Sequence, residues 1–193
     1  MKLAWTLRRA LAATALMIAV VGAPVEGGAT VMVKLSPEAH VAQSDVIARV
    51  VAGPSAARWN EDNSRPLTLT RLLVREYLKG AGPTELTLRQ FGGTLDGMTM
   101  VVPGDGRLVE GREYLLFLRR GDGVVYLTAM GQSVYEVRPT SNGVMVQRDL
   151  SDVEFAAPDA RGGIVVVEAP DEAPESLSRF TGAVLSIVRR GRR

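Results

Sequence analysis

Short apolar runs separated by turn residues dominate the middle of the chain. Between residues 44 and 148, runs of Val, Ile, Leu and Phe recur at intervals of about ten residues, with Gly, Asp, Asn or Pro between them. Most of these runs have the length of strands and are too short for typical helices. The spacing predicts a mainly β domain with roughly seven or eight short strands, arranged as a sandwich or a closed barrel.

The individual strands differ in pattern. Residues 84–91 alternate apolar with polar, which indicates a half-buried strand, whereas residues 67–78 are apolar on both faces and predict a coiled or bulged strand. Residues 53–66 are polar and rich in turn formers, so we expect a long surface loop there. Residues 149–174 are acidic, and we expect them to be loop-like apart from a possible edge strand at 164–167. The other expected strands cover residues 46–51, 113–119, 124–129, 134–137 and 144–146.

Two helices flank this β region. Ser36 can cap a helix, Pro37 suits the first helical position, and the sequence predicts a short helix over residues 37–43. Near the other end, residues 176–190 carry apolar side chains at helical spacing. They predict an amphipathic helix that packs one face on the barrel through Leu177, Phe180, Val184 and Ile187.

The first 29 residues have the pattern of a secretory signal peptide. Residues 1–9 carry three basic residues and no acid, and residues 10–23 are apolar or small. That run is short for a membrane span. Small residues at Gly27 and Ala29 predict cleavage between Ala29 and Thr30; cleavage after Ala23 is the alternative. We therefore expect export to the periplasm or the extracellular space, and a mature domain of residues 30–193 without a transmembrane anchor.

Composition excludes several kinds of protein. The chain has 23 basic and 21 acidic residues, of which the leader holds three and one, so the mature part has 20 of each. This balance argues against a general nucleic-acid binder, since such proteins carry excess Lys and Arg. The absence of cysteine excludes disulfides, thiolate nucleophiles and cysteine zinc sites. Only three of the 23 basic residues are lysine, a bias of GC-rich coding sequences that suggests a bacterial source.

Several short motifs carry a family resemblance. These are Ser44-Asp45-Val46-Ile47, Lys79-Gly80, Gly92-Gly93 and the run from Gly111 to Leu118. Together they resemble a broad set of exported bacterial proteins of unknown function, over roughly residues 44–137. The fold of that set is similar to the netrin-like domain of the tissue inhibitors of metalloproteinases. The resemblance implies a single five-stranded Greek-key barrel of the OB type with flanking helices.

The same resemblance does not carry the inhibitor mechanism to this chain. Those inhibitors bind the zinc of a protease through an N-terminal cysteine, and this sequence has none. The resemblance therefore implies a fold and assigns no residue a role.

Few residues are candidates for catalysis. His40 is the sole histidine, and we expect it at the surface or in an interface, because it lies on the predicted short helix and no nucleophile-elbow pattern accompanies it. A histidine zinc site is excluded, because such sites need two or three histidines. The pair Glu61-Asp62 and the cluster Asp149, Asp152 and Glu154 could act as paired acids in hydrolysis. We expect them to solvate loops instead. The sequence thus predicts no catalytic residue, no cofactor and no metal.

Binding candidates lie in the expected loops. Trp59 with its neighbours Arg58 and Glu61 could form a binding hot spot, or the indole could cover the open end of the barrel. Residues 92–105, which open with Gly92 and Gly93, are the second contact candidate. We expect a non-enzymatic extracytoplasmic binding module with a protein or surface partner. The alternatives are a protease-inhibitor-like domain acting through loops and a carboxylate-dependent hydrolase.

Overall fold

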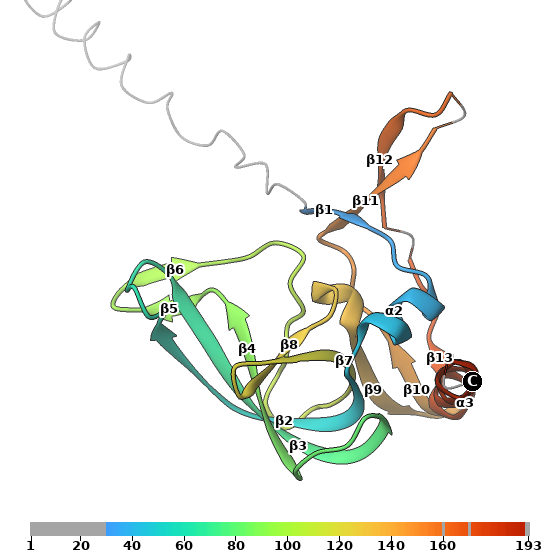
Figure 1. Cartoon of the computed structure of the whole chain (residues 1–193), viewed down its shortest axis with the longest axis horizontal. Coiled ribbons are helices and arrows are strands. Elements are labelled where there is room, and N and C mark those ends of the chain that lie inside the picture. Colours follow the sequence, from blue (N-terminus) through green and yellow to red (C-terminus); the bar gives the residue numbers. More distant parts are fainter. Residues whose placement is uncertain (1–29, 160, 170, 192–193) are drawn as a thin grey trace, which may run out of the picture.

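The protein is mainly β, with a short N-terminal helix and a C-terminal helix (Figure 1). The computed structural model describes residues 30–159, 161–169 and 171–191. The expected signal peptide lies outside these residues. Within them, no helix has the length and apolar character needed to cross a membrane. In chain order the elements are β1 (Thr30–Val33), α2 (Pro37–Gln43), β2 (Val46–Trp59), β3 (Pro66–Lys79), β4 (Glu85–Phe91), β5 (Gly93–Leu95), β6 (Met98–Met100), β7 (Glu113–Gly121), β8 (Val124–Leu127), η1 (Met130–Ser133), β9 (Val134–Thr140), β10 (Gly143–Gln147), β11 (Val153–Pro158), β12 (Ile164–Glu168), β13 (Glu175–Ser176) and α3 (Leu177–Arg190).

One eight-stranded sheet, in the order β13-β10-β9-β7-β2-β3-β4-β8, contains most of the strands. It branches along β7, whose first half pairs with β9 and whose second half pairs with β8. Strand β8 also meets β4 in parallel, through the single pair Leu88 and Val125. The pairings β7-β2-β3-β4-β8 therefore return to β7.

The central strands β2 and β7 are buried on both faces. Alternate residues such as Val46 and Leu116 point into the space enclosed by β2, β3, β4, β7 and β8. Their neighbours, such as Ile47 and Phe117, point to the other face, where α2 and α3 cover them with Val41, Val184 and Val188. Burial on both faces explains why these strands are nearly continuous apolar runs in the sequence.

A second, three-stranded sheet has the order β1-β11-β12, with β1 parallel to β11. Its inner face supplies a small core of Val153 and Phe155, joined by Leu150 and the partly buried Met32. Strands β5 and β6 form a separate hairpin.

Both predicted helices are confirmed, and so is the bulged character of β3. The Ser36 hydroxyl accepts a hydrogen bond from Ala39 N at 3.1 Å, which caps α2. Buried Val184 and Val188 fix α3 on the sheet. The pairing of β2 with β3 shifts register at three places, including one between Ala52 and Ser55.

Two expectations about loops are wrong. Residues 53–66 are not a long loop, because β2 continues to Trp59 and β3 begins at Pro66. The Gly53-Pro54 step falls at the register shift, where a proline is tolerated in a strand. Residues 149–174 contain β11, which pairs with β1 on one side and β12 on the other, in addition to the expected edge strand.

Candidate binding site

The tip of the β2–β3 hairpin, residues 60–65, is a tight turn held by its own side chains. Asn60 Oδ1 accepts hydrogen bonds from Ser64 N at 2.8 Å and Arg65 N at 3.0 Å. The carboxylate of Asp62 accepts from Ser64 Oγ at 2.8 Å, and this hydrogen bonding holds the pKa of Asp62 below its usual range. Glu61 and Asp62 are exposed on this turn, so they do not face another acid across a closed cleft.

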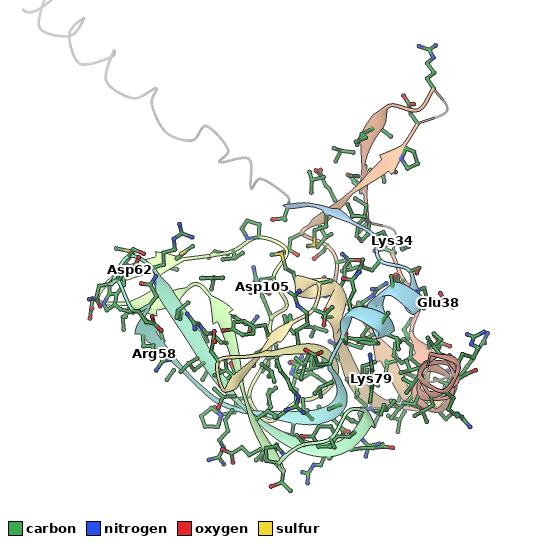
Figure 2. All side chains as sticks on the ribbon, in the orientation of Figure 1. Lys34, Glu38, Arg58, Asp62, Lys79 and Asp105 are labelled. Atoms are coloured by element: carbon green, nitrogen blue, oxygen red, sulfur yellow. The ribbon has the colours of Figure 1, made fainter. Side chains whose placement is uncertain are left out.

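Trp59 joins two hairpins. Its indole Nε1–H donates to Asp96 Oδ2 at 2.9 Å, and Asp96 sits in the turn between β5 and β6. The indole is half-buried, while neighbouring Arg58 is exposed. Figure 2 places Arg58 and Asp62 at the end of the molecule away from Glu38. The bond to Asp96 therefore anchors the indole at a corner formed by the two hairpin tips.

The glycines predicted for the site allow this corner to close. Gly92 has φ +94°, and a Cβ there would lie 2.7 Å from the backbone oxygen of Met100. Gly93 has φ +131°, and a Cβ there would lie 2.7 Å from Thr68 Oγ1. Both positions require glycine, because a side chain at Gly92 would displace β6 and one at Gly93 would push β5 away from β3. The structure thus brings Trp59, Gly92 and Gly93 into one corner, with Glu61 farther out on the turn.

Large apolar side chains are exposed in the same segment. Phe91 is 53 % exposed and Val101 is 63 % exposed, and Met98 lies between them on β6. Met98 and Val101 lie in the contact segment 92–105 that the sequence predicts, whereas Phe91 is not among the predicted residues. Alternation along β4 does place Phe91 on the polar face, with Thr87 and Arg89, so that signal was available. We call Arg58, Trp59, Phe91, Met98 and Val101 the corner surface.

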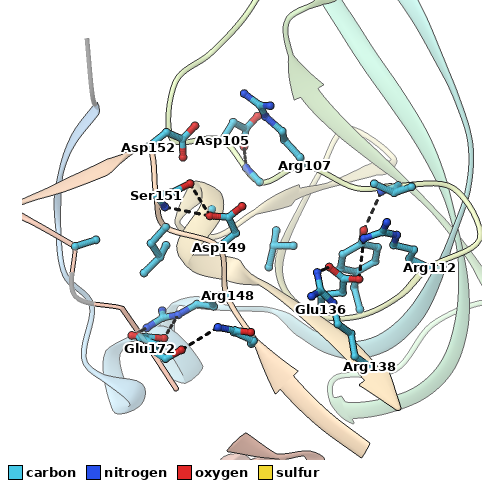
Figure 3. A pocket seen from close by; sticks show the side chains of 18 of the residues that line it. Asp105, Arg107, Arg112, Glu136, Arg138, Arg148, Asp149, Ser151, Asp152 and Glu172 are labelled. Carbon is cyan, nitrogen blue, oxygen red and sulfur yellow. Dashed lines mark hydrogen bonds and ion pairs between the residues drawn. The ribbon is translucent and has the colours of Figure 1, made fainter. Parts of the chain in front are cut away.

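A separate polar pocket of about 510 Å³ lies beside β9 and β10 (Figure 3). Its walls come from residues 105–114, from β9 and β10, and from residues 148–152 and 171–172. Its charged side chains form three groups, and most of these residues are not predicted from the sequence because they come from distant segments. The groups are Arg112 with Glu136 and Arg138, Arg148 with Glu172, and Asp105 with Arg107, Asp149 and Asp152.

The first two groups are ion-paired. Glu136 accepts from Arg112 Nη1 at 3.0 Å and from Arg138 Nη2 at 2.5 Å, and the bond from Arg138 is the main cause of its lowered pKa. Arg148, only 9 % exposed, pairs with Glu172 through two nitrogens and lies over the Tyr135 ring, 4.9 Å from its centroid. Burial raises the pKa of Tyr135 to about 12. The buried, doubly bonded Arg148 is therefore a fixed part of the wall, whereas Arg112 and Arg138 are more than half exposed.

The third group contains carboxyl groups with opposite pKa shifts. Burial raises the pKa of Asp105, and the nearby charge of Asp152 adds to the effect. Hydrogen bonds from the Ser151 hydroxyl and backbone lower the pKa of Asp149. Asp149 and Asp152 from the predicted acidic cluster therefore reach the pocket, whereas Glu154 lies on β11. No set of three or more His, Asp or Glu residues in the described part of the chain is arranged to hold a metal ion.

His40 is buried, which corrects the expectation of a surface or interface residue. Its side chain is 3 % exposed, stacks on Phe117 at 4.1 Å between ring centroids, and has Nε2 3.0 Å from Ser133 Oγ. Desolvation first, and then the charge of Arg148, lower its pKa to about 4. His40 and Val41 are the buried residues of helix α2, so His40 lies on the face of the helix that packs on the sheet. Since Ser133 is fully buried as well, this Ser–His contact holds η1 against α2 and is closed to substrates.

No known protein family matches the chain, and no curated protein matches it.

Proposed function

We propose that this protein is an exported, non-enzymatic binding module. It binds a protein partner through the corner surface of an OB-type barrel. Export is supported by the leader sequence, and the netrin-like barrel by the order of strand pairing. Five strands, β7-β2-β3-β4-β8, pair in a ring that closes through one bridge. A five-stranded, partly open ring of this kind matches the OB type.

The observation that carries the proposal is the exposure of Phe91, Met98 and Val101 in the segment next to the hairpin tip that holds the anchored Trp59 and the exposed Arg58. Aromatic residues, Met and Arg are the types enriched in protein interfaces. Holding the indole through Asp96 reduces the entropy lost when a partner docks, which favours binding. Hence a protein segment with both apolar and acidic side chains suits this surface best.

The position of the corner within the ring adds support. OB barrels bind ligands on the face of their second and third strands and through the loop between the first and second. In this chain β3 and β4 occupy those strand positions, and residues 60–65 form that loop. The corner surface lies where the loop meets the end of β4, so it coincides with the binding position of the fold type.

Site-specific photo-cross-linking in cells that export the protein tests the proposal. A photoreactive residue in place of Met98 should trap one protein partner, whereas the same residue in place of Val144, an exposed valine on β10, should not. Binding of the purified partner should then weaken at least tenfold in Phe91→Ala, about 1.4 kcal/mol, and stay unchanged in Val144→Ala. Equal trapping at both positions, or unchanged binding by Phe91→Ala, would refute the proposal.

A second candidate function is acid–base hydrolysis in the polar pocket. It is favoured by one observation, the opposite pKa shifts of Asp105 and Asp149 in the same cavity, a pattern typical of an acid and a base. Asp105 would hold the proton and Asp149 would activate water. Turnover of an ester or glycoside that disappears in both Asp105→Asn and Asp149→Asn, but persists in Phe91→Ala, would favour this function over binding.

A further inference from the structure

The β11–β12 hairpin projects from the body of the protein, and β12 is its outer edge (Figure 1). All five residues of β12 are exposed. Ile164 is 81 % exposed and Val166 is 53 % exposed, with Val165 and Val167 also open to solvent. Four consecutive β-branched apolar residues therefore stand on a strand with one free edge.

Natural proteins usually protect such an edge with charges, proline, a bulge or a covering segment. Residues 164–167 contain neither a charge nor a proline, and the pairing of β12 with β11 has no register shift. An exposed apolar edge without such protection indicates a surface that is covered in the working state.

The hydrogen bonds at the two ends of the hairpin identify which residues of β12 face the free edge. Asp159 N donates to Gly163 O at 2.8 Å, and Ala169 N donates to Val153 O at 3.2 Å. Bonded positions alternate along an antiparallel pair. Odd-numbered residues of β12 therefore bond to β11, and the backbone groups of Ile164, Val166 and Glu168 point outward. Val166 is the middle one of these three.

Charge along the hairpin is arranged so that an antiparallel copy would complement it. Glu154 and Glu168 lie directly opposite each other at the base, an unfavourable pair of like charges, and neither has an ion pair among the described residues. Arg161 lies at the tip, where the Asp159 carboxylate already accepts backbone bonds from Arg161 and Gly163. A second hairpin running the opposite way would bring its Arg161 to the end of the interface that carries the glutamate pair, three residues beyond the position opposite Glu168.

We propose that two copies of the protein pair through β12 about a two-fold axis at Val166. Val166 then lies opposite its counterpart and exchanges two backbone hydrogen bonds with it, Val165 lies opposite Val167, and Ile164 lies opposite Glu168. Because the interface is self-complementary, it closes on two copies. The two three-stranded sheets become one sheet with β1 at each outer edge.

The cysteine-free chain allows a direct test of this register. In Val166→Cys, the two cysteines lie on the axis, with Cα atoms about 5.5 Å apart, within the range of a disulfide. Val165→Cys is the matched control, because its two copies are offset by two residues and their Cα atoms are about 7–8 Å apart. Under mild oxidation the protein expressed from its full sequence should form a disulfide-linked dimer with the first variant and remain largely unlinked with the second.

Sedimentation equilibrium supplies the second test. Val166→Pro removes only an outward N–H, so the variant should keep its circular dichroism spectrum and weaken dimerisation at least tenfold. Arg161→Glu should also weaken it, and Arg161→Glu with Glu168→Arg should restore it. A wild-type monomer at concentrations on the order of 100 µM, equal linkage of both cysteine variants, or capture of β12 by a different protein would overturn the proposal.

Discussion

At the scale of single residues, His40 makes the stability of the protein sensitive to acid. The native imidazole takes up a proton only near pH 4, because it is buried and faces Arg148, whereas an unfolded histidine does so near pH 6.5. Between these values the unfolded chain binds more protons, so stability falls as pH falls. The free energy of unfolding should drop by roughly 3 kcal/mol between pH 7 and pH 4 on account of this residue.

Urea denaturation across that pH range measures the effect. Other groups titrate in the same range, including Asp105, whose raised pKa acts in the opposite direction. The informative quantity is therefore the difference from His40→Gln, which lacks the titrating ring and can still bond to Ser133. The pH dependence should be smaller in the variant. Identical slopes in the two proteins would contradict a buried, uncharged His40.

Arg148 and Glu172 form the ion pair on which the wall of the polar pocket depends. Glu172→Gln would keep one oxygen that can accept from Arg148 but would remove the negative charge that compensates the nearly buried guanidinium, whose other contacts are the carbonyl of Gln132 and the Tyr135 ring. Because Glu172 itself is partly solvated, we expect a loss of about 2 kcal/mol in the free energy of unfolding, less than for a fully buried pair. Glu76→Gln, in a half-exposed pair with Arg49, is the control and should cost under about 0.5 kcal/mol. Equal losses in urea denaturation would count against a structural role for Arg148.

At the scale of elements, glycines set the turns that join the strands. Gly80 and Gly123 have φ of +74° and +75°, but a Cβ on Gly80 would lie 2.6 Å from Asp45 O, while a Cβ on Gly123 would meet no atom within 4 Å. Gly123→Ala should therefore lower the free energy of unfolding by about 1 kcal/mol, because alanine is disfavoured in the left-handed conformation. Gly80→Ala adds a backbone clash and should cost roughly 2–3 kcal/mol. Thermal denaturation compares the two, and similar losses would show that the backbone near Asp45 can move.

Local chemistry explains which elements could be predicted from the sequence. Helix α2 was predictable because Ser36 and Pro37 act within one turn, and the β7–β8 hairpin because its turn needs positive φ at Asp122 and Gly123. Strand β11 could not be predicted, because Glu154 and the two alanines in it are poor strand formers. It is a strand because β1 and β12 both pair with it, and those contacts are distant in sequence.

The candidate sites also differ in whether local sequence reveals them. Trp59 could be selected because a tryptophan among turn residues stands out locally, yet its partner Asp96 lies 37 positions away. The polar pocket could not be predicted. Its charged residues look like ordinary solvated side chains in the sequence, and they converge only after residues 105–112 and 148–152 pack beside β9 and β10.

At the scale of the whole molecule, the exposed apolar surfaces belong to different parts of the fold. The corner surface is built on β2, β4 and β6, within or beside the main sheet, whereas β12 is the edge of the small sheet. Figure 1 shows the β5–β6 hairpin and the β11–β12 hairpin on different sides of the molecule. A partner bound as proposed at the corner surface would leave β12 free, and pairing of two copies would then present two corner surfaces and raise avidity.

In the ring of five paired strands, the pairing of β4 with β8 is the weakest, and we call this pairing the joint. Strands β4 and β8 pair only through Leu88 and Val125, whereas β2 pairs with both β3 and β7 along residues 47–51. Opening this joint breaks few hydrogen bonds and need not disturb the helices, which cover the other face of β2 and β7. Such openings have free energies well below that of global unfolding. The β8 amides that face β4 should accordingly exchange with deuterium at least tenfold faster than those of β2 in residue-resolved measurements, whereas the β8 amides paired with β7 should stay protected.

A variant separates local opening from general instability. Val125→Ala removes a buried side chain at the joint itself, and Val188→Ala removes one from α3 on the other side of the sheet. Both should lower global stability by about 1–3 kcal/mol. Only Val125→Ala should further accelerate exchange in β8 relative to β2, because it weakens the joint as well as the core. Uniform protection of β2 and β8 in the wild type would mean that the ring opens only when the whole protein unfolds.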